Sequence, residues 1–221
     1  MVDNTNNLTL IGTIKSIEEL YTHAQNRKYN KETFYQISLI VPRLSGTEDC
    51  LPIVVSEKLL YNVAIDNLTG KIVTIKGILR SRNYFDERVN KSRLTAFVLA
   101  QELIWEDVAT EEVSISNMVE LEGFVCKEPI FRETKSFRLI TDLLIANNRK
   151  RKTAYIPCIC WGVNAKLASK FVVSDKVLVK GRLQSRYYTR TLPDGSSAEE
   201  TVYEISVTDI SLVNEETNHN E

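Results

Sequence analysis

The chain has 221 residues, of which 43% are hydrophobic and 26% charged, and its formal net charge is −1. This length allows two domains of about 100 residues, each with a core of its own. The apolar runs have the length of strands, which excludes a membrane-spanning helix. The four cysteines lack the spacing of a disulfide framework or of zinc ligands. This excludes a disulfide-stapled fold and favours a cytoplasmic protein.

The first part of the chain has the pattern of a β-rich domain. Alternating apolar and polar residues predict five strands, over residues 8–17, 34–41, 51–55, 72–79 and 94–103. A helix is predicted between the third and fourth strands, over residues 57–65. Residues 86–92 carry turn-forming side chains and are expected to join the last two strands as a hairpin.

The second part of the chain repeats this order. Strands are predicted over residues 119–125, 137–146, 155–161, 176–183 and 202–212, with a helix over 163–171. Five strands with a helix between the third and fourth is the order of the OB fold, a five-stranded barrel. We therefore expect an all-β protein with one short helix per domain, built as two tandem five-stranded OB-fold barrels. The expected domains are residues 1–109 and 118–213, with a linker at 110–117 and a short polar tail at 214–221.

An internal repeat supports the division. Residues 71–84 match residues 175–188 at a shift of 104, and both copies contain Lys-Gly-x-Leu-x-Ser-Arg-x-Tyr. Residues 51–53 and 156–158 align upstream of this motif, as do residues 10–12 and 121–123. Matches in the same order along the chain indicate a duplication.

Charge is not uniform along the chain. Residues 8–107 hold 13 basic and 12 acidic residues, whereas residues 118–213 hold 15 and 11. The remaining acids lie in the terminal segments and the linker. Because local charge decides whether a surface attracts a polyanion, the net charge of −1 does not exclude nucleic acid as a partner.

The fourth strand of each copy carries a candidate binding face. Side chains alternate between the two faces of a strand, so the residues opposite the apolar core face form an outward row. In the second copy this row contains Lys180, Arg182, Gln184, Arg186 and Tyr188. In the first copy it contains Lys76, Ile78, Arg80, Arg82 and Tyr84. The alternative interpretation is a solvated sheet face without a ligand.

The third strand of the second copy adds exposed aromatic residues. If Ile156, Cys158 and Cys160 face the core, Tyr155 and Trp161 lie on the surface. Bases of a single strand stack on such rings while Lys and Arg contact the phosphates. Packing of Trp161 against the following helix is the alternative.

A run of four cations precedes the same strand, in an expected hairpin loop. It consists of Arg149, Lys150, Arg151 and Lys152. Adjacent cations repel one another, so an anionic partner would explain the run. A solvated loop is the alternative interpretation.

The first copy departs from this aromatic pattern. Cys50 and Ser56 stand where the second copy has Tyr155 and Trp161, and Tyr84 is the matched ring that remains. The loop at residues 26–31 offers cations and one further ring. We therefore expect the first domain to bind nucleic acid weakly or to serve as an assembly surface.

Three motifs of the second copy resemble the bacterial single-stranded DNA-binding protein family. Residues 142–149 resemble its second strand, which ends in Asn-Arg, residues 155–162 its third strand, and residues 179–188 its fourth strand. The resemblance covers residues 118–213 and, more weakly, residues 8–104.

The resemblance implies specific roles for these residues. Tyr155, Trp161 and Tyr188 would stack on bases, and Arg149, Lys180, Arg182 and Arg186 would contact phosphates. It also implies sequence-independent binding of single-stranded DNA in replication, recombination or repair. Because four OB domains act together in the family, a homodimer is expected.

The chain end departs from the family. The family tail has an acidic tip containing Pro-Phe that recruits enzymes, whereas this chain ends in Asn-His-Asn-Glu221 without an aromatic residue. We therefore do not expect it to recruit hub partners through such a tip. A mobile-element paralogue or a primosome-type accessory protein fits the sequence as well as a housekeeping protein.

No catalytic constellation, phosphate-binding glycine loop or metal-ligand motif appears, so we expect no enzyme activity, cofactor or metal. The main alternative function is an OB-fold protein-interaction module with weak or no nucleic-acid binding. RNA stays open as a ligand, because no residue that would read a 2′-hydroxyl is identified.

Overall fold

The structure is a computed structural model that describes residues 4–24, 31–106, 117–149, 152–192 and 194–213. Lys150 and Arg151 of the basic run therefore lie outside the described residues, as do the tail, the loop at 25–30 and residues 110–116 of the expected linker. Among the described residues, no helix combines the length and the apolar character needed to span a membrane.

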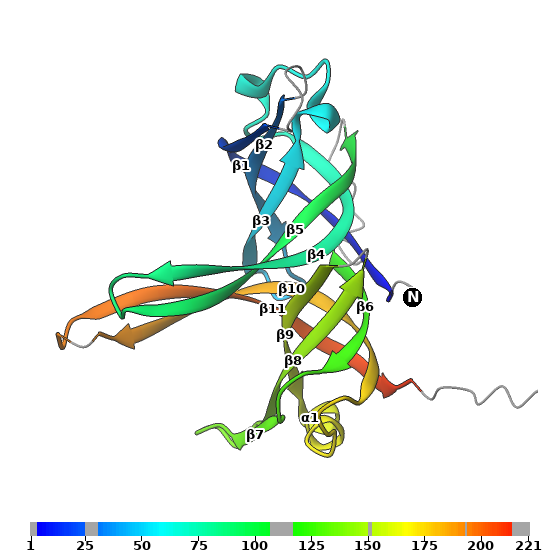
Figure 1. The fold of residues 1–221 in the computed structure, drawn as a ribbon, viewed down its shortest axis with the longest axis vertical. Helices are drawn as coiled ribbons and strands as arrows, with labels where there is room; N and C mark the ends of the chain where they lie inside the picture. The colour runs from blue at the N-terminus through cyan, green and yellow to red at the C-terminus, as the bar shows by residue number, and fades with distance from the viewer. Residues whose placement is uncertain (1–3, 25–30, 107–116, 150–151, 193, 214–221) are drawn as a thin grey trace, which may run out of the picture.

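The first half of the chain forms a closed five-stranded barrel (Figure 1). Its strands are β1 (Asn6–Ala24), β2 (Lys31–Pro42), β3 (Glu48–Ser56), β4 (Ile72–Asp86) and β5 (Lys91–Glu106). They are hydrogen-bonded in the order β2-β3-β5-β4-β1, and a further β1–β2 pairing closes the barrel. In β3, Leu51, Ile53 and Val55 point inward and are fully buried, as the alternation predicts.

The second half forms an equivalent barrel from the strands that follow. They are β6 (Asn117–Val125), β8 (Leu139–Arg149), β9 (Lys152–Trp161), β10 (Lys176–Thr191) and β11 (Ser197–Leu212). The order β6-β10-β11-β9-β8 is closed by a β6–β8 pairing, and the short strand β7 (Ile130–Glu133) extends β8. The expected fold of two tandem OB barrels is confirmed.

The helix prediction holds in one half and is wrong in the other. The second half has α1 (Gly162–Ala168) between β9 and β10. In place of the helix expected over 57–65, the first half has two short 3₁₀ segments, Glu57–Leu60 and Ile65–Asn67. Asn62 adopts a φ of 65°, in the left-handed region, which ends the helical path after one turn.

The Lys-Gly step of the repeated motif marks a bulge in each barrel. The pairing of β4 with β5 shifts register between Lys76 and Gly77, and that of β10 with β11 between Lys180 and Gly181. A Cβ at Gly77 would lie 2.5 Å from the Leu99 carbonyl oxygen. The corresponding distance at Gly181 is 2.3 Å, to Ser206. Both positions therefore require glycine, which explains why both copies share it.

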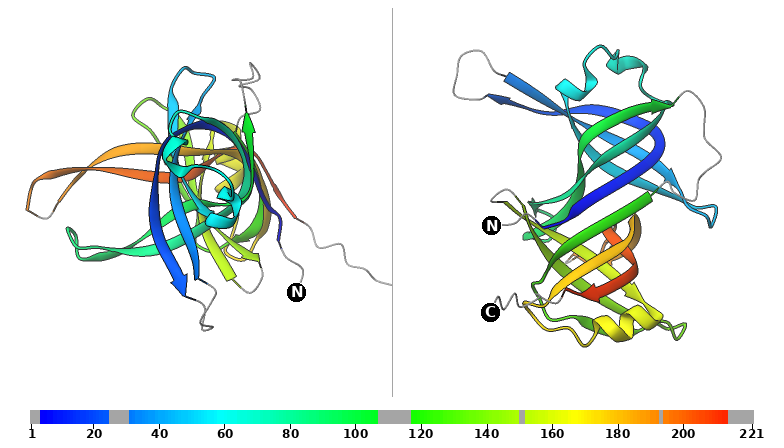
Figure 2. Two further views of the ribbon diagram at one scale, coloured as in Figure 1. Left: turned by 90° about the horizontal axis from the view of Figure 1, so that it is seen from above. Right: turned by 90° about the vertical axis from the view of Figure 1, so that its right-hand side faces the viewer.

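The two barrels are joined by an antiparallel seam between their first strands. β1 pairs with β6 from Asn6, opposite Leu121, to Leu10, opposite Asn117, with Leu8 opposite Val119 at the centre. This pairing merges the barrels into one 11-stranded sheet. The barrels lie one above the other on either side of the seam (Figure 2).

Two asparagines repeat one contact on the two sides of the seam. The Asn6 side chain accepts from the Leu79 N–H at 2.8 Å and donates to the Leu79 carbonyl at 2.9 Å. Asn117 makes the same pair of bonds with Leu183, at 2.9 and 2.7 Å. Since Leu79 and Leu183 are matched by the repeat, the halves are arranged with an approximate two-fold relation.

Two long hairpins leave the barrels on the same side of the molecule. They are formed by the ends of β4 and β5 and by the ends of β10 and β11 (Figure 1). The first turn follows Asp86, within the loop predicted at residues 86–92, and the second follows Thr191.

Candidate nucleic-acid interface

The third strand of the second barrel displays the two predicted rings. Tyr155 is 44% exposed and Trp161 is 37% exposed, at opposite ends of the predicted surface row on β9. Cys158 and Cys160 are buried, as predicted from alternation. Ile159, which strand alternation places on the same face as the rings, is also buried.

Trp161 directly precedes the following helix, and its side chain makes no capping hydrogen bond. It is the N-cap residue of α1, in extended conformation, and its partner across the sheet is Ile140 of β8. Tyr155 lies near the first barrel, because its backbone N–H donates to Ser81 Oγ of β4 at 2.8 Å.

Tyr188 is less accessible than the other two predicted rings. Its hydroxyl donates to Glu200 Oε2 at 2.8 Å, and the Arg186 guanidinium carbon lies 5.9 Å from its ring centre. Burial and the hydrogen bond to Glu200 raise the pKa of the Tyr188 hydroxyl. Tyr188 and the 42%-exposed Tyr84 both line a polar cleft of about 230 Å³ between the two hairpins.

Carboxylates partner the predicted cations of β10. Lys180 Nζ lies 3.8 Å from Glu120, and Arg182 Nη1 lies 3.6 Å from Asp49. Arg186 donates two hydrogen bonds to Glu204, at 2.9 and 3.0 Å. The outward row of the second half is therefore locally neutralised, which the strand pattern alone did not indicate.

The cations of β4 in the first half differ in their partners. Lys76 pairs with Glu102 at 3.2 Å across exposed surface. Arg80 and Arg82 form no ion pair with the described residues, and the Arg82 guanidinium carbon lies 5.9 Å from the centre of the Phe97 ring. The first half thus keeps two cations available to an external anion.

The ends of the basic run face the first half. Arg149 Nη1 donates to the Asn6 carbonyl at 3.1 Å, and Lys152 is exposed. Both line a groove of about 630 Å³ whose other walls come from β1, β2, β3, β4 and β5. Arg149 is the last residue of β8 and Lys152 is the first residue of β9, so the two described residues of the run lie in strands rather than in the expected loop.

This groove contains aromatic residues that the sequence analysis did not select. Tyr21 and Phe34 stack at 5.1 Å between ring centres with an interplanar angle of 23°. Phe97 lies in the same groove. Tyr21 lies beyond the first predicted strand, which ends at residue 17, so its position opposite Phe34 follows only from the longer β1 of the structure. The repeat comparison also missed the pair, because it matched rings at the third and fourth strands.

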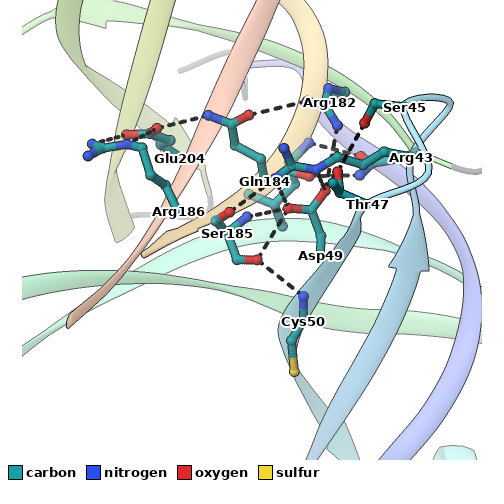
Figure 3. A network of polar contacts seen from close by, with 12 residues as sticks. Arg43, Ser45, Thr47, Asp49, Cys50, Arg182, Gln184, Ser185, Arg186 and Glu204 are labelled. Atoms are coloured by element: carbon teal, nitrogen blue, oxygen red, sulfur yellow. Dashed lines mark hydrogen bonds and ion pairs between the residues drawn. The ribbon is translucent and has the colours of Figure 1, made fainter. Parts of the chain in front are cut away.

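A buried carboxylate connects the two barrels (Figure 3). Asp49 of β3 is fully buried and accepts from the Ser185 backbone N–H of β10 at 2.7 Å. Arg43 binds the same carboxylate bidentately, and this hydrogen bonding raises the pKa of its guanidinium. Burial, together with the nearby Arg43, lowers the pKa of Arg182. Asp49 therefore holds the first barrel against β10 of the second.

The polar network continues from Asp49 along the second half. Arg182 donates to Gln184 at 3.3 Å, and Gln184 donates to Glu204 at 2.9 Å (Figure 3). Glu204 in turn binds Arg186. These side chains of β10 are therefore fixed by one another before any ligand arrives.

Within the described part of the chain, no group of three or more potential ligand side chains is placed to hold a metal ion.

The chain resembles known proteins in sequence and in fold. Residues 116–213 match the sequence profile of the Single-strand binding protein family. Two structures of the single-stranded DNA binding protein from Thermus aquaticus resemble the chain. A deletion mutant is 17% identical with a TM-score of 0.72 over 100% of both chains. The wild-type protein is 18% identical with a TM-score of 0.69 over 97% of this chain and 95% of that chain. At these identities the likeness shows a shared fold. A comparison with curated proteins found no match.

Proposed function

Because residues 116–213 match the profile of the Single-strand binding protein family, we propose that the chain binds single-stranded DNA without sequence preference, in replication, recombination or repair. It acts as a binding protein rather than an enzyme, and it works in the cytoplasm. The observation that carries the proposal is the pair of exposed rings on β9, Tyr155 and Trp161, within the segment that matches the family.

The binding chemistry is aromatic stacking combined with phosphate contacts. Each base stacked on a ring contributes about 1–3 kcal/mol, independent of base identity. Phosphates are contacted by the basic run at residues 149–152 and by Arg80 and Arg82. The ion-paired cations Lys180, Arg182 and Arg186 contribute less, because a phosphate must compete with a carboxylate that is already in place.

The two barrels act as one binding unit. We retain the division into residues 1–109 and 118–213, but the β1–β6 seam and the contacts of Asp49 hold the two parts in one arrangement. Two chains would bring four OB domains together, so we propose a homodimer. Light scattering on the purified chain tests this, and a monodisperse monomer would refute it.

A protein-interaction role, including that of a primosome-type accessory protein, is the second candidate function. The hairpin formed by β7 and β8 favours it, because Phe131 is 48% and Phe137 is 84% exposed on this hairpin. Large exposed rings that lie apart from the cations of the candidate interface fit a protein partner better than a nucleic acid.

Fluorescence anisotropy with labelled oligonucleotides tests the proposed function. The chain should bind a thymidine homopolymer more tightly than a duplex of equal length, and affinity should fall steeply with salt because bound counterions are released. A uridine homopolymer measures the preference between DNA and RNA. Absence of binding to every single strand at low salt would overturn the proposal and favour the interaction role.

A further inference from the structure

The candidate cations that have no carboxylate partner among the described residues line one groove. Four of the described cations that the sequence analysis selected form ion pairs: Lys76, Lys180, Arg182 and Arg186. The others, Arg80, Arg82, Arg149 and Lys152, form none with the described residues, and all four line the 630 Å³ groove of the first half. No carboxylate is among the residues that line this groove. The groove is therefore the part of the candidate surface with uncompensated positive charge.

The same groove offers rings on which bases can stack. Tyr21 is 49% exposed and stacks on Phe34, so the pair forms a two-ring surface already ordered before a ligand binds. Phe97 adds a third ring, with Arg82 placed above it. Rings beside unpaired cations suit a ligand with flat bases and a phosphate backbone, and the volume is in the range of ligand-binding pockets, about 300–1,000 Å³.

The equivalent surface of the second half lacks these properties. Arg80 pairs with Phe97 across β4 and β5, and Gln184, matched to Arg80 by the repeat, pairs with Glu204. A carboxylate thus stands in the second half where the first half has a ring. That carboxylate binds Arg186, the counterpart of Arg82.

We infer that this groove is a composite single-strand site, in which the first half supplies the rings and two arginines and the second half supplies Arg149 and Lys152. The inference rests on the proposed function and specifies where the strand lies. It replaces the expectation that the first domain binds weakly. Bases stack on Tyr21 and Phe34, and phosphates lie between Arg80, Arg82 and the end of β8.

The site is incomplete in either half alone. Arg149 is held against the seam by its bond to the Asn6 carbonyl, so its position depends on the β1–β6 pairing. Full-length variants are therefore the appropriate material for a test.

Charge-removing variants test the phosphate contacts. In the full chain, Arg80→Gln with Arg82→Gln should lower the magnitude of the salt slope for a thymidine homopolymer by about 1.4, at roughly 0.7 per lost phosphate contact on a single strand. Lys166→Gln removes an exposed charge on α1, outside the groove, and should leave the slope unchanged.

Ring-removing variants test stacking. Tyr21→Leu should weaken binding about 5- to 150-fold, the equivalent of one stacked base. Tyr61→Leu is the matched control, because Tyr61 is 79% exposed and lies outside the groove. Circular dichroism confirms that each variant is folded.

Photo-crosslinking to a halogenated oligonucleotide, with the crosslinked peptides identified by mass spectrometry, supplies an independent readout. Crosslinks to the peptides with Tyr21, Phe34 or Phe97 support the composite site. Strong binding by the wild type with unchanged affinity of the groove variants, and crosslinks confined to Tyr155 and Trp161, would overturn the inference while leaving the proposed function intact. A wild type that binds no single strand would overturn both.

Discussion

Arg93 and Glu200 occupy equivalent positions in the two halves of the chain, and they face each other as an ion pair with 2.5 Å between Nη1 and Oε2. Arg93 pairs with Tyr84 across the first hairpin, and Glu200 pairs with Tyr188 across the second. In an assembly of two identical domains, equivalent positions would carry the same charge. Here duplication has allowed the two positions to acquire opposite charges, which favours pairing of the first half with the second.

This ion pair predicts a measurable coupling between the hairpins. Arg93 and Glu200 are both largely buried, so the pair is little screened by solvent. In a double-mutant cycle with Arg93→Gln and Glu200→Gln, urea unfolding should give a coupling free energy of about 1–3 kcal/mol. A coupling near zero would contradict a direct stabilising contact between the hairpins.

The Asp49 carboxylate should be the most sensitive single position between the barrels. Asp49→Asn leaves the half-buried Arg43 and Arg182 without a counter-charge, and breaking such a buried pair costs about 3–5 kcal/mol. Chemical denaturation measures the loss. Glu48→Gln, at an exposed neighbour, is the control and should change stability by less than about 0.5 kcal/mol.

The cysteines should divide into two reactivity classes. Burial raises the pKa of Cys160 to about 12 and that of Cys158 well above its ordinary value, so neither forms a thiolate near neutral pH. Cys50 and Cys126 are half-buried. A thiol reagent at neutral pH should therefore label the native chain at Cys50 and Cys126 first, with Cys158 and Cys160 reacting on denaturation. Rapid labelling of Cys158 in the native state would contradict the packing of β9.

Acid should weaken the contact between β6 and β10. The hydrogen bond from Lys176 lowers the pKa of Glu122 in the folded state below its ordinary value of 4.5. The contribution of this carboxylate to stability is therefore complete above the unfolded pKa and is lost as pH falls through the folded pKa. Glu122→Gln should reduce the change in unfolding free energy over that acid range. An unchanged pH dependence would show that Glu122 is not responsible.

The repeat and the strand alternation predicted most of the fold, because each strand keeps one apolar face. Two features of the fold were not predicted correctly. β7 is four residues long and wholly exposed, so it has no alternation to detect. The helix expected over residues 57–65 does not form, because Asn62 adopts a left-handed conformation that ends the turn.

The candidate site was less predictable than the fold. Alternation placed Tyr155 and Trp161 on the surface, as the structure has them. Whether a cation is free depends on its cross-strand neighbour, and the bulge before Gly181 shifts which residue stands opposite Gln184 and Arg186. The groove around Tyr21 depends on how the halves pack, which no periodicity within one strand encodes.

Intrinsic tryptophan fluorescence during titration with a thymidine homopolymer, at low and moderate salt, tests stacking in the proposed function most directly. Trp161 is exposed on β9, whereas Trp105 packs against the first core and should respond little. We predict strong, salt-sensitive quenching that Trp161→Ala abolishes, together with a loss of affinity of about 5- to 150-fold. Absence of quenching and of binding by the wild type at low salt would contradict the account and leave the exposed rings as a protein interface.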